Sequence, residues 1–303
     1  MDIESIISQI NAGYEVTETD LNSIENSLGI KIPPLMRDYY LRYNGAWVKT
    51  IYAKGIDGDI YGLHGISPIK YKNKPAGNNT FVPDDSGIGE FEQYVEWNRD
   101  YDVVVSNRLV PFAYDEGGEM YYWQVETTAV YYVLSEDIDN AKRVFDDLES
   151  FFQAFCDAVR LKESLEDNKP KESIEELEKN CWDEPPHYSS YVVITSYKAR
   201  QKPICELTDE EIRLLISQKI GLKYLLPIAV RMLQINPFMM ITFYPGDLMN
   251  CLLTLDVEDW KDNTDVFRNF FQIALDNQVR IFQNKELSGD RLLRLMDYYS
   301  SLQ

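Results

Sequence analysis

Residues 110–134, VPFAYDEGGEMYYWQVETTAVYYVL, combine four acids and seven aromatic residues with no Lys or Arg. Asp115, Glu116 and Glu119 form a group of carboxylates that could bind a cation or act as an acid–base pair. The same stretch also fits a hairpin turn, because the Gly-Gly pair inside it accepts positive φ and the flanking acids stay solvated. A hairpin tip can in turn display its charge to a partner.

The aromatic residues after this turn allow two interpretations. Adjacent side chains in a strand point to opposite faces, so Tyr121 and Tyr122 are not expected to point inward together. Exposed Tyr and Trp rings beside acids are typical of an interface for a basic protein. The alternative is that every ring belongs to the core and the acids only keep the protein in solution.

Other catalytic groups are scarce in the sequence. His64 and His187 are the two histidines, and neither has metal-ligand spacing to a second His or Cys. No phosphate-binding Gly-rich loop and no nucleophile elbow is present. We therefore expect no enzymatic activity, no catalytic residue, no metal and no cofactor.

The charge balance narrows the class of partner. The chain has 303 residues, 45% of them hydrophobic, and a formal net charge of −20. Residues 1–160 hold 27 acids and 13 bases, whereas residues 161–303 hold 23 acids and 17 bases. Such an acidic surface repels phosphate backbones and attracts basic proteins, so we expect a protein partner and no direct nucleic-acid binding.

Cysteine usage and the terminus point to a location. Cys156, Cys181, Cys205 and Cys251 are scattered singly, which fits a reducing compartment. The start of the chain, MDIESIISQI, lacks the basic region of a signal peptide, and no stretch is long enough to span a membrane. These features predict a cytoplasmic protein without membrane contact.

The first half of the chain predicts an α+β domain over residues 1–161. Thr17 or Thr19 caps an amphipathic helix that ends at Gly29, and a Pro-led helix follows and ends at Asn44-Gly45. Short apolar runs separated by Gly, Asp and Asn then indicate an antiparallel sheet up to residue 134. A long amphipathic helix closes the domain.

Residues 162–180 carry mixed charges and are expected to form a solvated linker. Residues 181–303 predict a second, mainly α-helical domain. Its start, SSYVVITSYKA at residues 189–199, favours a strand, and Thr208 with Glu211 forms a capping box for the next helix.

Residues 18–160 resemble the SUKH superfamily of the Smi/Knr type. The matching stretches are IENSLGIKIPPLMRDYYLRYNGA, LVPFAYDEGGEMYYW, VYYVLSED and DLESFFQAF. The acidic-Gly turn reads Asp-Glu-Gly-Gly here, a modest departure from the Gly-rich turn of the family. The resemblance to the bacterial members implies an immunity protein against polymorphic toxins, nucleases among them. A fungal relative of the same family regulates cell-wall synthesis, which implies a regulatory role as the alternative.

Residues 206–260 resemble immunity proteins of contact-dependent growth inhibition systems. The matching stretches are ELTDEEIRLLISQKIGLKYLLPIAVRMLQINP and TFYPGDLMNCLLTL, followed by Trp260. Two such modules in one chain imply a protein in which each domain answers its own toxin.

Together these resemblances and the charge pattern predict a non-enzymatic immunity protein that covers a basic toxin face. The alternative is a regulatory scaffold for endogenous partners. Replacing the three acids of the turn by lysine is expected to abolish protection and to leave thermal stability nearly unchanged. The expected toxin-binding residues are Asp84, Asp85, Asp115, Glu116, Glu119, Tyr121, Tyr122 and Trp123 in the first domain, and Tyr244, Asp247 and Trp260 in the second, with Asp247 also a candidate helix cap.

Overall fold

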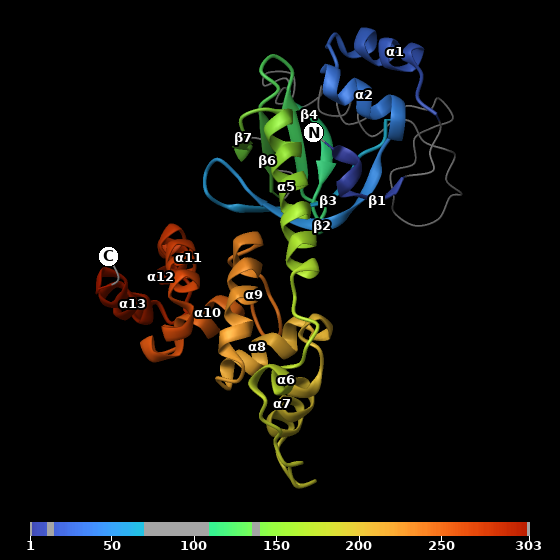
Figure 1. Ribbon diagram of the computed structural model, residues 1–303. Coiled ribbons are helices and arrows are strands. Elements are labelled where there is room, and N and C mark those ends of the chain that lie inside the picture. The colour runs from blue at the N-terminus through green and yellow to red at the C-terminus, as the bar shows by residue number, and fades with distance from the viewer. Residues whose placement is uncertain (1, 11–14, 70–108, 135–139, 302–303) are drawn as a thin grey trace. The chain divides into compact units, whose positions relative to one another are not determined.

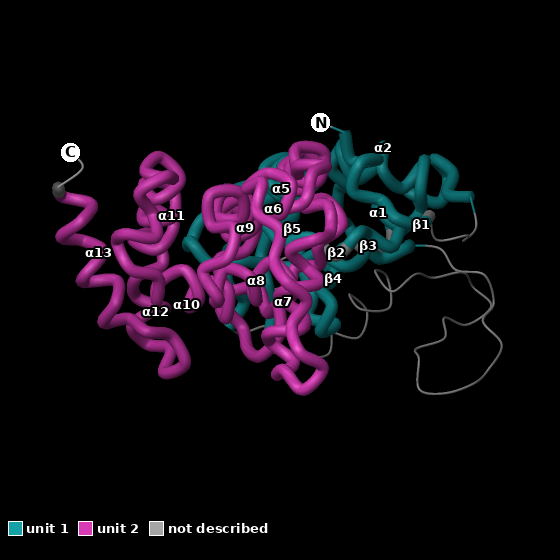
Figure 2. Tube along the Cα trace, turned by 60° about the horizontal axis from the view of Figure 1, so that its bottom comes forward, with its two compact units in different colours: residues 1–160 teal, residues 161–303 magenta. Residues whose placement is uncertain are grey.

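The structure is a computed structural model that describes residues 2–10, 15–69, 109–134 and 140–301. The chain divides into two compact units, residues 1–160 and residues 161–303 (Figure 2). The first unit is an antiparallel sheet with helices and the second is helical, which confirms the predicted fold class.

The sheet of the first unit has seven described strands, each paired with the next one along the chain in antiparallel fashion. Short connections at Gly55–Asp59 and Asp115–Glu119 place β2 beside β3 and β4 beside β5, because a tight turn returns the chain beside the strand it has just left. The strands are β1 (Ile7–Ile10), β2 (Ala46–Lys54), β3 (Ile60–Ile66), β4 (Leu109–Tyr114), β5 (Met120–Gln124), β6 (Val130–Val133) and β7 (Lys142–Phe145).

Two short helices lie between β1 and β2 in the chain, α1 (Glu18–Leu28) and α2 (Pro34–Tyr43). Thr17 caps α1, with Asp20 completing a capping box, and Gly29 ends the helix at a φ of 64°. Asn44 ends α2 in the same left-handed conformation, with a φ of 46°. The predicted helical hairpin and its stop signals are confirmed.

The long helix α5 (Leu148–Asp167) lies across one face of the sheet (Figure 1). Phe151 is fully buried at the centre of an aromatic cluster. Its ring centroid lies 5.1 Å from that of Phe112, 5.2 Å from those of Tyr121 and Phe145, and 4.9 Å from that of Phe155. Edge-to-face contacts of this kind add to the area each ring buries and hold the sheet on the helix.

The second unit packs its helices around a separate apolar core that contains Trp260 and Phe267. The helices are α6 (Ile174–Glu178), α7 (Tyr191–Gln201), α8 (Asp209–Ser217), α9 (Leu222–Ile235), α10 (Asp247–Leu253), α11 (Thr264–Asp276), α12 (Gln278–Gln283) and α13 (Gly289–Ser301). The capping box expected for α8 is present, with Thr208 bonded to the backbone of Glu211.

Residues 162–180 were expected to form a solvated linker and instead contribute to the second unit. Helix α5 runs on to Asp167, and both Leu165 and Ile174 are buried in the helical core. Lys169 is buried as well, with its ammonium 2.8 Å from the carboxylate of Glu166. A few widely spaced apolar residues are enough to dock this segment, and the charges between them conceal that pattern.

The expectation of a strand at residues 189–199 is wrong. Ser190 accepts a hydrogen bond from the backbone N–H of Val193 at 3.4 Å and starts α7 there. Ala199 and Arg200, near the other end of the helix, are buried. Packing of that end outweighs the strand preference of the Tyr-Val-Val-Ile-Thr run.

The packing around Phe151 gives a prediction for stability. Phe151→Ala removes a ring that contacts Phe152 and the four other rings of the aromatic cluster, so we expect the first unit to lose about 3–5 kcal/mol of unfolding free energy. Leu134→Ala, at an exposed side chain of the same unit, should change it by less than about 0.5 kcal/mol. Urea denaturation of both variants measures the difference, and equal midpoints would contradict the proposed packing role.

Candidate protein-interaction site

The acidic turn joins β4 to β5 and is organised by Asp115. One oxygen of its carboxylate, Oδ1, accepts backbone N–H groups from Gly117 at 2.9 Å and from Glu119 at 3.0 Å. Gly118 adopts a φ of 88°, which favours glycine. The stretch is therefore a hairpin turn in which Asp115 is part of the local structure.

The second oxygen of Asp115 has a hydroxyl partner. Tyr132 in β6 donates its hydroxyl to Oδ2 of Asp115 at 2.5 Å. Burial, followed by this hydrogen bond and the charge of Asp115, raises the pKa of Tyr132 far above the ordinary phenol value, so the hydroxyl keeps its proton. The carboxylate of Asp115 thus has a structural role without any cation, because the hydroxyl of Tyr132 is its partner.

The predicted aromatic anchors of the site are buried. Tyr121 and Trp123 point into the core beneath α5, whereas Tyr122 packs on the opposite face against Leu109 and Val133. Adjacent rings do point to opposite faces, as expected, but both faces of β5 are covered. Tyr121, Tyr122 and Trp123 are therefore core residues and not surface anchors.

Exposed rings lie on neighbouring strands of the face opposite α5. The register aligns Trp47 in β2 with Gly65 in β3, and Gly65 with Tyr114 in β4. Trp47 is 43% exposed, and its ring packs edge-on against Tyr114 and His64 at centroid distances of 5.9 and 5.2 Å. A large ring in this position is held by its neighbours and remains open to solvent.

Two glycines of β3 make room for these rings. A Cβ on Gly65 would lie 2.3 Å from the ring of Tyr114, and a Cβ on Gly62 would lie 3.2 Å from the ring of Tyr52 and 3.9 Å from the Cβ of Asp115. The missing side chains let Tyr52 and Tyr114 lie close over the sheet, with Tyr52 next to the acidic turn. The Gly-Leu-His-Gly sequence is the signal that sequence reasoning missed.

Acids line one side of this aromatic surface. Burial, followed by the charges of Glu116 and Asp115, raises the pKa of Tyr52. Among the described residues, the structure has no ion pair to Asp115 or Glu116. We call the set Trp47, Tyr52, His64, Tyr114, Asp115 and Glu116 the outer-face patch.

The remaining predicted residues of the first domain have different positions. Glu119 is half-buried at the base of the turn and bonds Asp115 through its backbone. Asp84 and Asp85 lie outside the described residues. Because Asp115 supports the hairpin, replacing all three acids of the turn is not expected to leave stability unchanged, and Glu116 is the position where charge alone can be altered.

In the second unit, Asp247 organises a loop. Its buried carboxylate accepts the backbone N–H groups of Ile241, Thr242 and Phe243 at 3.0, 2.8 and 3.0 Å. Gly246 occupies the position before α10, so Asp247 does not cap that helix from outside but fixes the loop that precedes it.

Tyr244 and Trp260 have structural surroundings too. The hydroxyl of Tyr244 accepts the side-chain N–H of Asn250 at 2.8 Å. Trp260 is fully buried and stacks on Phe270 at 5.0 Å between ring centroids, so it belongs to the core. The loop held by Asp247 instead exposes Phe243, with the guanidinium of Arg213 4.6 Å from its ring centroid.

Two absences concern only residues 2–10, 15–69, 109–134 and 140–301. Within these ranges, no three His, Cys, Asp or Glu side chains come together in an arrangement able to hold a metal ion. In the same part of the chain, none of the helices combines the length and apolar character that crossing a membrane requires.

The chain is built from two units, one with an antiparallel sheet and helices and one that is helical. Residues 15–154 match the SMI1 / KNR4 family (SUKH-1), and residues 176–270 match the CDI immunity proteins. The chain thus combines a SUKH-1 domain with a domain of the CDI immunity type, as the two resemblances in the sequence indicate, and these domains support a role in toxin immunity. No curated protein and no solved structure matches the chain.

The two acids of the turn should differ in their effect on stability. Asp115→Ala removes two hydrogen bonds to the backbone and leaves the Tyr132 hydroxyl without its acceptor, so we expect a loss of about 1–3 kcal/mol of unfolding free energy. Glu116→Ala, at an exposed position, should cost less than about 0.5 kcal/mol. Chemical denaturation of the two variants tests this difference, and equal stability would exclude the organising role of Asp115.

Proposed function

We propose that this chain is a non-enzymatic immunity protein of the cytoplasm that neutralises a toxin by covering a cationic face of it. The observation that carries the proposal is the outer-face patch, where a half-exposed Trp47 packs against Tyr114 and where Tyr52 lies beside Asp115 and Glu116. It lies within the SUKH-1 domain. Rings that are fixed before binding lose little side-chain entropy on contact, and the acids select a positive partner.

A nuclease is the toxin class that this chemistry fits best. Nucleases hold their substrate by its phosphates and therefore carry a basic surface. Two adjacent carboxylates at a hairpin tip present negative charge to such a surface, and Trp47 supplies an apolar anchor next to it. Net acidity, −14 over residues 1–160, speeds the encounter.

The rival function is a regulatory scaffold that binds endogenous partners through the same patch, since the matched family takes its name from SMI1 and KNR4. Both functions predict protein binding, so the partner distinguishes them. Toxin domains encoded beside the gene for this chain are the probes, purified as catalytically inactive variants. Titration calorimetry with the full chain should detect binding to at least one of them under the immunity proposal and to none under the scaffold proposal.

Trp47 should be an energetic centre of the interface. We expect Trp47→Ala to weaken toxin binding by about 2 kcal/mol, which is roughly a 30-fold rise in Kd. Leu134→Ala, at an exposed apolar side chain outside the patch, is the matched control and should leave Kd unchanged. Calorimetric titration gives both values, and equal affinities of wild type and the Trp47 variant for every toxin domain that binds would reject the outer-face patch as a binding site.

The charge of Glu116 should act mainly on the association rate. We expect Glu116→Lys to lower kon at low salt by about tenfold or more, because it reverses one charge of the steering field. Raising the ionic strength should shrink the difference between variant and wild type, since screening removes the attraction. Stopped-flow measurements at two salt concentrations test this, and a difference that is independent of salt would argue against electrostatic steering.

A further inference from the structure

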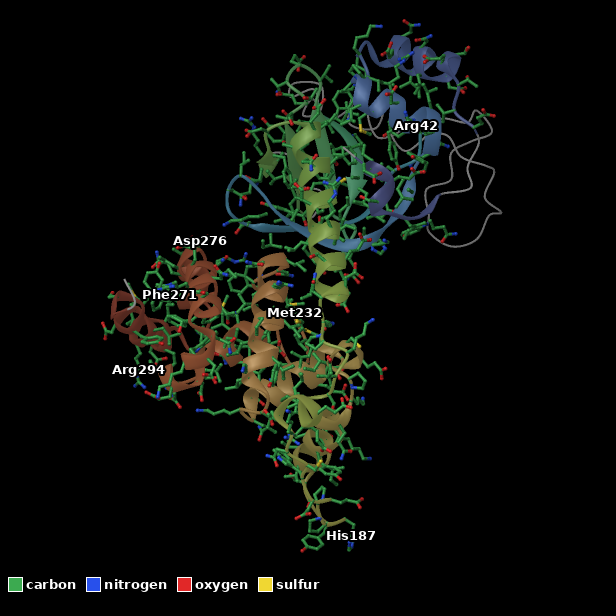
Figure 3. The ribbon with its side chains drawn as sticks, in the orientation of Figure 1. Arg42, His187, Met232, Phe271, Asp276 and Arg294 are labelled. Carbon is green, nitrogen blue, oxygen red and sulfur yellow. The ribbon has the colours of Figure 1, made fainter. Side chains whose placement is uncertain are left out.

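A second exposed aromatic surface lies in the helical unit, at the loop before α7 and in the first turn of that helix. Tyr188 and Tyr191 are each 80% exposed, and Trp182, Val192 and Val193 are exposed as well. Figure 3 shows His187 at the outer end of this loop, away from the body of the unit. We call residues 181–193 the projecting tip.

The base of the tip is clamped by a buried arginine. Arg200 donates one N–H to the backbone oxygen of Asn180 and another to the carboxylate of Glu178, both at 2.6 Å. Its guanidinium also lies 4.4 Å from the ring centroid of Trp182. Since Arg200 itself is inaccessible to solvent, the chain leaves the unit at a fixed point.

The outer part of the tip is stiffened by local sequence. Pro185 and Pro186 fix two backbone φ angles, and the backbone N–H of Ser189 donates to the oxygen of Pro186 at 2.9 Å. Ser190 then caps α7. The tyrosines on either side of this turn are thus held in solvent by a preorganised backbone, which lowers the entropy lost when a partner binds.

The charge of the tip indicates the kind of partner. Asp183 and Glu184 are exposed, and residues 181–193 contain neither Lys nor Arg. Clusters of exposed tyrosine and tryptophan mark interaction sites, and rings of these types dominate binding energy at protein interfaces. Acids at their side complement a cationic surface with an apolar recess.

We propose that the projecting tip docks a basic toxin domain, as a contact element of the helical unit that acts separately from the outer-face patch. The proposal rests on the proposed function as an immunity protein. The matched family segment, residues 176–270, includes the whole tip. One chain would then recognise toxins through two surfaces of similar chemistry, one in each unit.

The test uses the full chain and the inactive toxin domains described above. We expect Tyr188→Ser combined with Tyr191→Ser to weaken binding of one toxin domain at least 30-fold, and Trp47→Ala to leave that same interaction unchanged. Val279→Ser, which alters a 62% exposed apolar side chain on α12, is the matched control and should bind as wild type does. A second variant, Asp183→Lys with Glu184→Lys, should slow association of the same domain at low salt.

Each outcome decides a different question. Thermal melts of the variants should coincide with wild type, because the altered side chains lie in solvent, so weaker binding reports contact. If wild type binds toxin domains and both tip variants bind every one of them equally well, the tip proposal is overturned while the immunity function stands. If wild type binds none of the toxin domains, the proposed function and the tip proposal fall together.

Discussion

The packing of the α5 phenylalanines against one face of the sheet is the interaction on which the first unit depends. Because Phe151 and Phe155 fill that face together with rings from β4, β5 and β7, the inward side of the strands is committed to the core. Along β2 and β3, the opposite face of the sheet is not committed to this core. Trp47 stays half-exposed on that face, so the position of the outer-face patch follows from where α5 packs.

Much of the fold was predictable because its signals are local. Caps at Thr17 and stops at Gly29 and Asn44 act within a few residues, and so do the turns between strands. The position of the patch was not predictable, because it depends on a bulge in β4. The irregular register directs both Phe112 and Ala113 inward and brings Tyr114 to the outer face, whereas strict alternation places Tyr114 inside.

The errors over site residues share one physical origin. Sequence alone gives the alternation of side chains but not the covering of each face, so Tyr122 was among the expected binding residues although Leu109 and Val133 pack against it. Asp115 was assigned to partner binding because no base is near it in sequence. A hydroxyl 17 residues further on, that of Tyr132, accounts for its carboxylate, and such a pairing follows only from the strand order.

The two exposed surfaces reach similar chemistry by different means. In the sheet, glycines at positions 62 and 65 leave space in which rings lie against the backbone. In the helical unit, a loop stiffened by two prolines holds its rings away from the body of that unit. Shared acidity speeds the approach of any basic protein and so discriminates poorly among toxins. Discrimination among toxins must then come from the fixed positions of the rings. A ring that meets no recess on the toxin buries no contact area, although the acids still attract any basic protein. Under the proposed function, two rigid surfaces of different shape would allow one acidic chain to answer toxins of different shape.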